Sequence, residues 1–302
     1  MRCEMSANDP KRTFDCTPSE MVVEARFFNR RRDMVEIDLD SYFARIGYSG
    51  PKTAGLETLM ALHALHPAAI TFENIDPLMK RPVRLDLKSL ATKLVDDKRG
   101  GYCYEQNTLF AAVLRSLGFP VATLAARPQW GPPGFIRART HMVLRIDLPE
   151  GPYICDVGYG RLTLTAPLRF NLDIEQTTPH GLYRFVQIGD EFQLQAKLND
   201  RWSPVFQMAL QEQLPADWEV ANWFNSTHPE STFTQSLMVA RSVGERRLGL
   251  FNSDYRIYFS DGRTEHHKLQ TAEQLASVLQ NDFNINLPDG CELMFDQVLD
   301  RN

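Results

Sequence analysis

The 302-residue sequence lacks the features that would place it in a membrane or on a nucleic acid. Its longest apolar run, Leu109 to Leu114, has six residues, well short of the roughly 18 that a membrane-spanning helix needs. The formal net charge is −5, which disfavours a general binder of nucleic acids or anionic lipids. We therefore expect neither a membrane nor a nucleic acid among its partners.

The sequence is also poor in cysteine and lacks glycine motifs for nucleotides. Its five cysteines include no pair with C-x-x-C spacing, which disfavours a zinc ribbon, and they are too few for a disulfide scaffold. No phosphate-binding or dinucleotide-binding glycine motif is present. No apolar secretory core stands near the start, so we expect a protein of the reducing cytoplasm. We also expect no bound metal.

What is present is the composition of a folded protein. Hydrophobic residues make up 43% and charged residues 24% of the chain, and the length predicts two or three compact units. Residues 1–33 differ from the rest, because they mix charges of both signs and hold no sustained periodicity. We predict a disordered extension there.

Helical periodicity fills the first third of the chain after this extension. Asp38 can cap a first helix that Gly47 ends, and Gly118 can end a later one. Pro67 is expected to stop a helix that opens at Thr53. The spacing predicts four helices, at residues 38–47, 53–67, 87–95 and 103–117.

After the fourth helix the pattern changes from helical spacing to alternation. Residues 140–147 alternate between apolar and polar side chains, and a turn at 148–151 folds the chain back on itself. Thr271 and Gln274 form a capping-box pattern that predicts one helix near the end. Strands are predicted at 121–126, 140–147, 153–157, 183–188, 191–196 and 255–259, with a further one from 264 onward. This order predicts an α+β protein whose middle section is an antiparallel sheet or barrel.

Cys103 is the first candidate for chemistry. Gly100 and Gly101 directly precede it and allow a sharp backbone turn with open space above the thiol. At the start of a helix, unpaired N–H groups and the positive end of the dipole stabilise a thiolate. Most free cysteines are small buried hydrophobes, but this setting favours a nucleophile.

A histidine and an aspartate are expected to meet in the hairpin that follows. If the turn at 148–151 closes it, His141 lies opposite or nearly opposite Asp156 on one face of the sheet. Such a pair can orient an imidazole as a base, although an ordinary structural pair fits the pattern equally well. Cys155 points to the other face and is expected in the core, as is His63 on the apolar side of its helix.

The loop between the first two predicted strands has an undecided role. It spans residues 127–139 and is rich in proline and arginine. Trp130 and Phe135 within it could touch a substrate, or they could form an apolar plug. We interpret the loop as a connector or a rim.

The string Arg99-Gly-Gly-Tyr-Cys-Tyr-Glu-Gln-Asn107 closely resembles the signature of the arylamine N-acetyltransferase family. The likeness is specific between about residues 37 and 170 and weaker beyond, and residues 1–33 lie outside it. Tyr159 departs mildly from the pattern, since many members have phenylalanine there. The other matching segments are Phe72-Glu-Asn-Ile75, Arg139-Thr-His-Met142, Asp156-Val-Gly-Tyr-Gly160, Ser226-Thr-His-Pro229 and Phe233.

This resemblance implies a fold with a papain-like Cys-His-Asp core. It implies an N-terminal helical bundle that carries the nucleophile, over residues 34–120. A middle antiparallel β-barrel, over residues 121–220, would carry the histidine and the aspartate. An α/β lid would follow over residues 221–302.

The resemblance also implies an activity, with acetyl-CoA as donor and an arylamine, arylhydrazine or N-hydroxyarylamine as acceptor. Cys103 would be the acylated nucleophile, His141 the acid and base, and Asp156 the residue that orients it. Phe72 and Phe233 would line the acceptor pocket. Two half-reactions at one cysteine would give ping-pong kinetics. The resemblance also implies a role in xenobiotic metabolism and a reaction that needs no metal.

Three other readings stay open at this point. A papain-like or transglutaminase-like cysteine hydrolase would use the same three residues. A relative within the family could use malonyl-CoA or another acyl-CoA, or close a macrolactam. A binding or structural protein could carry the triad without catalysis.

Overall fold

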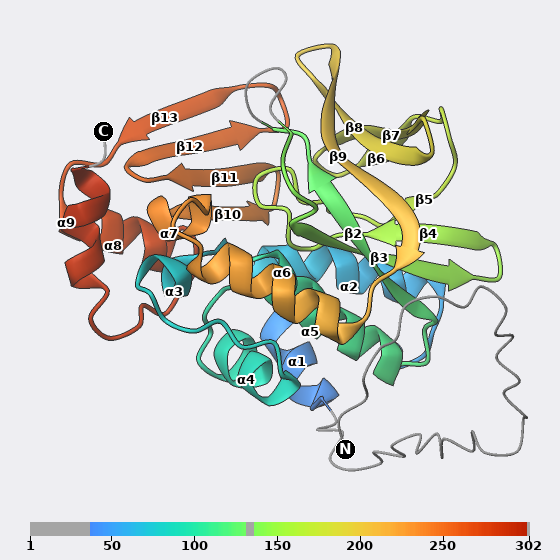
Figure 1. Ribbon diagram of the computed structural model, residues 1–302, viewed down its shortest axis with the longest axis horizontal. Coiled ribbons are helices and arrows are strands. Elements are labelled where there is room, and N and C mark those ends of the chain that lie inside the picture. The colour runs from blue at the N-terminus through green and yellow to red at the C-terminus, as the bar shows by residue number, and fades with distance from the viewer. Residues whose placement is uncertain (1–36, 131–135, 301–302) are drawn as a thin grey trace, which may run out of the picture. The chain divides into compact units, whose positions relative to one another are not determined.

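The computed structural model describes residues 37–130 and 136–300, and it is an α+β protein, as predicted (Figure 1). The predicted disordered extension at 1–33 lies outside these residues. The helices are α1 (Leu39–Ile46), α2 (Leu56–Ala69), α3 (Ile75–Leu78), α4 (Leu87–Ala91) with the π-helical turn η1 (Thr92–Asp96), α5 (Cys103–Ser116), α6 (Pro215–Thr227), α7 (Thr232–Gln235), α8 (Ala272–Asn281) and α9 (Glu292–Leu299). None of the helices in the described ranges is long and apolar enough to cross a membrane.

Most strands of the chain fall in its second half. The strands are β1 (Phe72–Glu73), β2 (Val121–Pro128), β3 (His141–Leu148), β4 (Gly151–Cys155), β5 (Leu168–Arg169), β6 (Gln176–Thr178), β7 (Gly181–Ile188), β8 (Glu191–Leu198), β9 (Arg201–Glu212), β10 (Met238–Val243), β11 (Arg246–Phe251), β12 (Asp254–Phe259) and β13 (Thr264–Lys268). They form two antiparallel sheets of eight and five strands.

The ends of α1 and α5 follow the local chemistry that predicts them. The Asp38 carboxylate accepts hydrogen bonds from the N–H groups of Asp40 and Ser41, and Gly47 ends α1 with a left-handed φ of 73°. Leu117 is the C-cap of α5, and Gly118 follows it with a left-handed φ of 89°. Both helices were predictable because their signals lie within a few residues.

The second helix differs from its prediction at both ends. Its N-cap is Gly55 rather than Thr53, and Pro67 lies inside α2 instead of stopping it. Proline removes one backbone hydrogen bond from a helix and crowds the preceding turn. Here the loss falls close to the C-terminal end of the helix and Pro67 is buried, and the helix runs on to Ala69.

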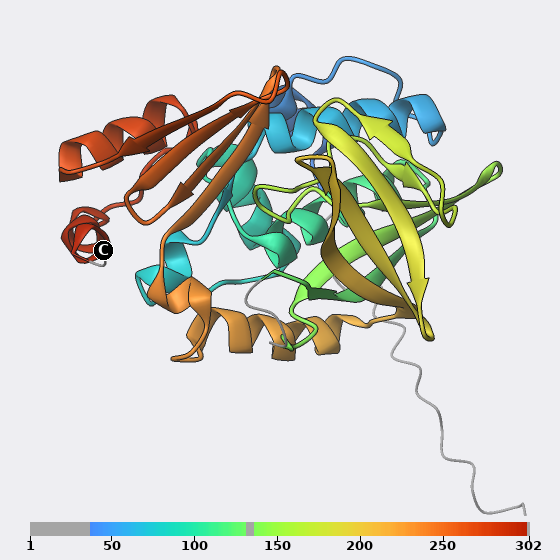
Figure 2. The same cartoon turned by 90° about the horizontal axis from the view of Figure 1, so that it is seen from above.

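The eight-stranded sheet is the predicted antiparallel middle section. Its strand order is β5-β4-β3-β2-β9-β8-β7-β6, and the sheet curls into a nearly closed barrel (Figure 2). The β3–β4 hairpin pairs Leu144 with Cys155 and Leu148 with Gly151, so the predicted turn is confirmed. One face of this hairpin packs on α5.

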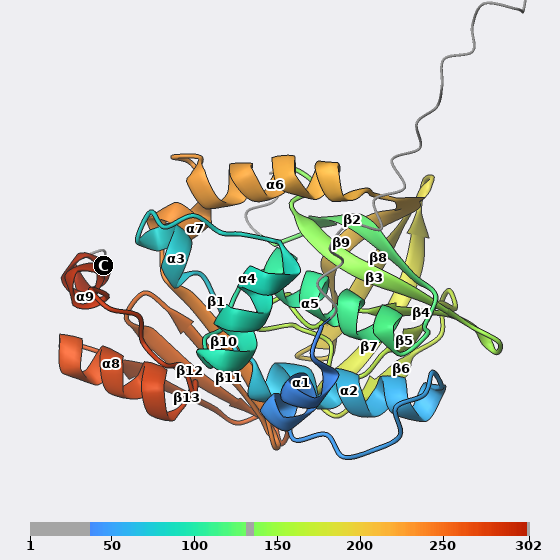
Figure 3. The same cartoon turned by 90° about the horizontal axis from the view of Figure 1, so that it is seen from below.

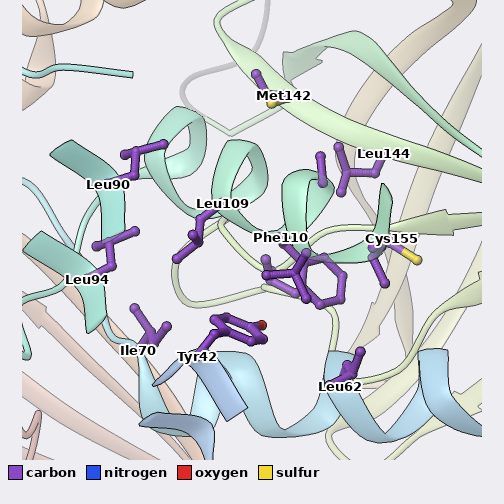
Figure 4. Packing of buried hydrophobic residues seen from close by; sticks show 14 of the residues in the cluster. Tyr42, Leu62, Ile70, Leu90, Leu94, Leu109, Phe110, Met142, Leu144 and Cys155 are labelled. Atoms are coloured by element: carbon purple, nitrogen blue, oxygen red, sulfur yellow. The ribbon is translucent and has the colours of Figure 1, made fainter. Parts of the chain in front are cut away.

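The largest core cluster joins the helices to that hairpin. Tyr42 of α1, Leu62 of α2 and Phe110 of α5 meet Leu144 and Cys155 there, all fully buried (Figure 4). Cys155 is therefore a core residue, as predicted. Burying large apolar side chains contributes about 1.5–3 kcal/mol each, so this cluster holds α5 firmly against the barrel.

The five-stranded sheet contains a strand that the sequence pattern did not predict. Its order is β1-β10-β11-β12-β13, and β1 comes from the helical first third of the chain. Glu73 N–H of β1 donates to the carbonyl of Gly101 (3.1 Å), and Gly101 N–H donates to Thr71 (3.2 Å). The last third of the chain is thereby linked to the turn that precedes Cys103.

Helix α6 was also not predicted from the pattern. It runs from the end of the barrel past α5 and β2 (Figure 3). The Trp218 indole N–H donates to Thr123 Oγ1 of β2 (3.0 Å), and Asn222 Nδ2 donates to Val83 O (2.9 Å). The predicted domain boundary between residues 220 and 221 falls within this helix, and the division into three domains stays a prediction.

Candidate active site

Cys103 is the first residue of α5, and its side chain is 3% exposed. The first turn is held by Glu105, whose carboxylate accepts the N–H of Tyr102 at 3.0 Å. The thiol of Cys103 points toward the carbonyl oxygen of Thr140 at 3.8 Å. The sulfur thus lies where a helix start meets the first residue before β3.

Two glycines allow close packing of the backbone around the start of α5. A Cβ added at Gly100 would lie 2.1 Å from the carbonyl oxygen of Thr71, which no side chain can tolerate. A Cβ at Gly158 would lie 2.9 Å from Cys103 Cα and 3.0 Å from Gln106 Cβ. The segment after β4 can therefore lie directly on the start of α5 only because residue 158 has no side chain.

We expect Gly158→Ala to push this segment away from Cys103. Overpacking of this kind costs about 1–3 kcal/mol of unfolding free energy, measurable by urea denaturation, and should slow alkylation of Cys103 by iodoacetamide. Gly55→Ala is the matched control, because a Cβ there meets no atom within 4 Å. Equal stability and thiol reactivity in the two variants would contradict the close-approach argument.

His141 and Asp156 are in contact. The paired register of the hairpin ends at Leu144 and Cys155. If it were continued past the end of β4, residue 158 would lie opposite His141, and Asp156 would be nearly opposite, as predicted. His141 Nε2 lies 2.8 Å from Asp156 Oδ2, so Nδ1 is the ring nitrogen that does not contact this carboxylate. Cys103 and His141 line the same pocket, and the thiol lies near enough to contribute to the raised pKa of His141. The structure therefore brings together the three residues that the sequence singled out.

The Asp156 carboxylate is completely buried, yet it is fully hydrogen-bonded. Its Oδ1 accepts from Asn107 Nδ2 and from the N–H of Gly158, both at 3.0 Å. Burial alone would raise the pKa of Asp156, but the charge and hydrogen bond of His141, together with these two donors, lower it below its usual value. Asp156 is therefore an anion at neutral pH.

This anion controls the charge of His141. Burial would lower the pKa of His141, but the charge and hydrogen bond of Asp156, and then the Cys103 thiol, raise it to about 10. The ring is accordingly an imidazolium at neutral pH. A cationic ring beside a sulfur atom is the arrangement that stabilises a thiolate.

A buried ionic network supports the first turn of α5 from behind. Lys93 Nζ lies 2.6 Å from both Asp76 Oδ2 and Glu105 Oε1. Arg99 Nη2 lies 2.9 Å from Glu73 Oε1 and 3.0 Å from Asp76 Oδ1. Burial raises the pKa of Glu105 to about 7 against the opposing effect of Lys93. Because Glu105 also accepts from Tyr102, the network fixes the backbone that presents the sulfur.

A pocket of about 230 Å³ opens onto Cys103 and His141. Phe72 and Phe233 lie in its wall with ring centroids 6.2 Å apart, and Trp130 lies at its rim. Tyr159 packs edge-on against His141, with centroids 4.8 Å apart, and its hydroxyl donates to Val205 O. The pocket is therefore aromatic on several sides, and the prediction for Phe135 lies outside the described residues.

Three polar residues lie near the site, and their contacts there were not predicted from the sequence. Asn107 stands four residues after Cys103, so helical spacing could have placed it on the same face; its Oδ1 accepts from Val157 N–H at 3.1 Å. His63 is buried as expected, and its Nε2 also accepts the N–H of Asp156 at 3.1 Å. Asn225 reaches the site from α6, and no local pattern indicates it.

No cluster of three or more His, Cys, Asp or Glu side chains that could bind a metal ion occurs within residues 37–130 and 136–300.

Comparisons with known proteins identify the family of the chain. A family model described as N-acetyltransferase matches residues 55–291. The arylamine N-acetyltransferase of Escherichia coli is 39% identical over 252 residues, which cover 83% of this chain and 90% of the relative. A Salmonella typhimurium protein, named arylamine N-acetyltransferase / N-hydroxyarylamine O-acetyltransferase, is 35% identical over 252 residues, with the same coverage of 83% and 90%.

A solved structure is equally similar. The arylamine N-acetyltransferase of Mycobacterium marinum in complex with CoA is 39% identical, with a TM-score of 0.84 over 87% of this chain and 99% of that chain. Sequence and fold therefore match over almost the whole length of the relatives. The chain belongs to the arylamine N-acetyltransferase family, a family of acyltransferases.

Proposed function

We propose that this protein transfers acetyl groups from acetyl-CoA to aromatic amines, hydrazines or N-hydroxyarylamines through an acetyl-Cys103 intermediate. The observation that carries the proposal is that Cys103 and His141 line one aromatic pocket while His141 is in contact with Asp156. The family relationship supplies the donor, because one relative binds CoA. The arrangement is that of a papain-like nucleophile, base and orienting residue.

The first half-reaction uses the Cys103 thiolate and the protonated ring of His141. The thiolate of Cys103 attacks the thioester carbonyl of acetyl-CoA, a C–S bond forms, and the carbonyl electrons move to oxygen. The N–H of Cys103, in the first turn of α5, has no partner inside the helix and can donate to that oxygen. The bond to the CoA sulfur then breaks, and the departing sulfur takes the proton of His141 and leaves as a thiol.

The second half-reaction begins with a neutral imidazole. The amine nitrogen attacks the acetyl-Cys103 carbonyl and forms a C–N bond. His141 accepts one proton from this nitrogen, the C–S bond breaks, and the thiolate–imidazolium pair is restored with release of the amide. Because one product leaves before the second substrate reacts, the kinetics are ping-pong.

The pocket fits a flat aromatic acceptor. Phe72 and Phe233 present two rings at the wall that also contains the sulfur. Ring stacking contributes about 0.5–1.5 kcal/mol beyond simple burial, so aromatic amines gain over aliphatic ones. We assign acceptor binding to these two residues.

Intact-mass measurement tests the whole proposal. We expect acetyl-CoA to add the mass of one acetyl group to the wild-type protein, and an aromatic amine then to remove it and appear as the N-acetyl product. Peptide cleavage that needs no CoA thioester would support a cysteine hydrolase instead. A stable adduct from malonyl-CoA, with none from acetyl-CoA, would support a relative that uses another acyl group.

A further inference from the structure

Asn225 is a buried polar residue in the pocket that the proposed mechanism does not use. It lies in the last turn of α6, is 3% exposed, and lines the pocket that contains Cys103 and His141. Its Nδ2 donates to the carbonyl oxygen of Thr140 at 3.1 Å, the same oxygen that the Cys103 thiol approaches. The Asn225 carboxamide and the Cys103 sulfur therefore lie next to the same carbonyl oxygen, that of Thr140.

The orientation of this carboxamide is fixed. A carbonyl oxygen can only accept hydrogen bonds, so Asn225 must present its NH₂ group to Thr140, and Oδ1 takes the opposite position. The backbone is held as well, because Ser231 Oγ donates to Asn225 O at 2.6 Å. Within residues 37–130 and 136–300, no group donates a hydrogen bond to Oδ1. An acceptor held in this way at a pocket wall is available to a bound molecule.

We propose that Asn225 Oδ1 accepts an N–H hydrogen bond from the acceptor amine as it attacks acetyl-Cys103, a role that rests on the proposed acetyl transfer. The attacking nitrogen gains positive charge as the C–N bond forms. A primary amine then has a proton for His141 and a further N–H for Asn225, and this N–H remains in the amide product. An N-methylated amine has only the proton that His141 removes.

The proposal makes Asn225 a specificity residue for primary amines and hydrazines. A hydrogen bond to a group that becomes charged corresponds to a rate effect of about 10- to 100-fold. The advantage should appear only for nucleophiles that keep an N–H after His141 has removed one proton. General damage to the site would instead slow every acceptor equally.

The test compares kcat/KM for aniline and N-methylaniline in wild type and in Asn225→Ala. We expect the ratio of the two kcat/KM values to fall by about 10- to 100-fold in the variant, whatever happens to the rate of acetylation by acetyl-CoA. An unchanged ratio contradicts the proposal, whether both amines slow equally or neither slows. Equal slowing would show that Asn225 only positions Thr140 and His141.

Asn225→Asp is the matched variant. It keeps an acceptor oxygen at nearly the same position and loses the donor to Thr140, so the ratio should be retained even where both rates fall. A ratio that falls as far as in Asn225→Ala contradicts the proposal. Circular dichroism checks whether both variants fold, and the acetyl adduct of wild type is measured in parallel. If wild type forms no adduct, the proposed acetyl transfer is wrong, rather than the role of Asn225 within it.

Discussion

Cys103→Ala should abolish acetyl transfer. The variant removes the thiol that lies with His141 in the aromatic pocket. Removing a catalytic nucleophile typically costs on the order of 10⁶-fold in turnover, so no activity should be detectable. The measurement is release of CoA thiol in the presence of an aromatic amine, together with intact mass after incubation with acetyl-CoA.

Cys155→Ala is the matched control for this prediction. Cys155 is fully buried on the opposite face of the hairpin and packs in the core. We expect it to keep the acetyl adduct and to lose some stability through the small cavity that it leaves. An acetyl adduct on the Cys103→Ala protein, or appreciable turnover by it, would contradict the assignment of the nucleophile.

Asp156→Asn should reduce turnover by on the order of 10⁴-fold, the size of the loss when the orienting residue of a comparable triad is neutralised. The change removes the charge that keeps the pKa of His141 at about 10. His141 in wild type should therefore stay protonated from pH 5 to pH 9 and lose its proton only as the pH passes about 10. In the variant, burial is no longer opposed by the carboxylate, so the pKa falls and the ring should be neutral at pH 9.

NMR signals of the His141 ring measure this difference directly. The same samples should show slower alkylation by iodoacetamide at pH 7 in Asp156→Asn than in wild type, because the imidazolium beside Cys103 is lost. Thermal unfolding serves as the control, since Asp156 is buried and accepts three hydrogen bonds. Identical His141 titration in both proteins would contradict the electrostatic role of Asp156.

Features with local signals were predictable from the sequence. Asp38, Gly47 and Gly118 act through backbone groups one to four residues away, so the ends of α1 and α5 could be predicted. The β3–β4 hairpin follows from alternation and a turn of four residues. The end predicted for α2 at Pro67 was wrong. The lost backbone hydrogen bond is offset by the burial of Pro67, and the sequence pattern does not show that burial.

Features that depend on distant contacts were not predictable in this way. The buried face of α6 carries polar side chains, among them Asn222, Asn225 and Ser226, so it shows no apolar stripe. Strand β1 has two residues, too few for any alternation, and it forms by pairing with β10 more than 160 residues later. The nucleophile and the His–Asp pair were found separately, and the specific motif around Cys103 connected them to one family.

The pairing of β1 has a consequence for any attempt to shorten the chain. Phe72 lines the pocket at Cys103 and also belongs to the five-stranded sheet, where it pairs with Ala240. Phe72 also forms a parallel bridge with Gly101, two residues before the sulfur. A truncated protein that ends after the barrel would lack β10, the strand that pairs with β1. The turn before Cys103, which is bonded to β1, would lose this support. The C-terminal third is accordingly part of the framework around Cys103, and we expect a protein that lacks this third to lose the arrangement of the site.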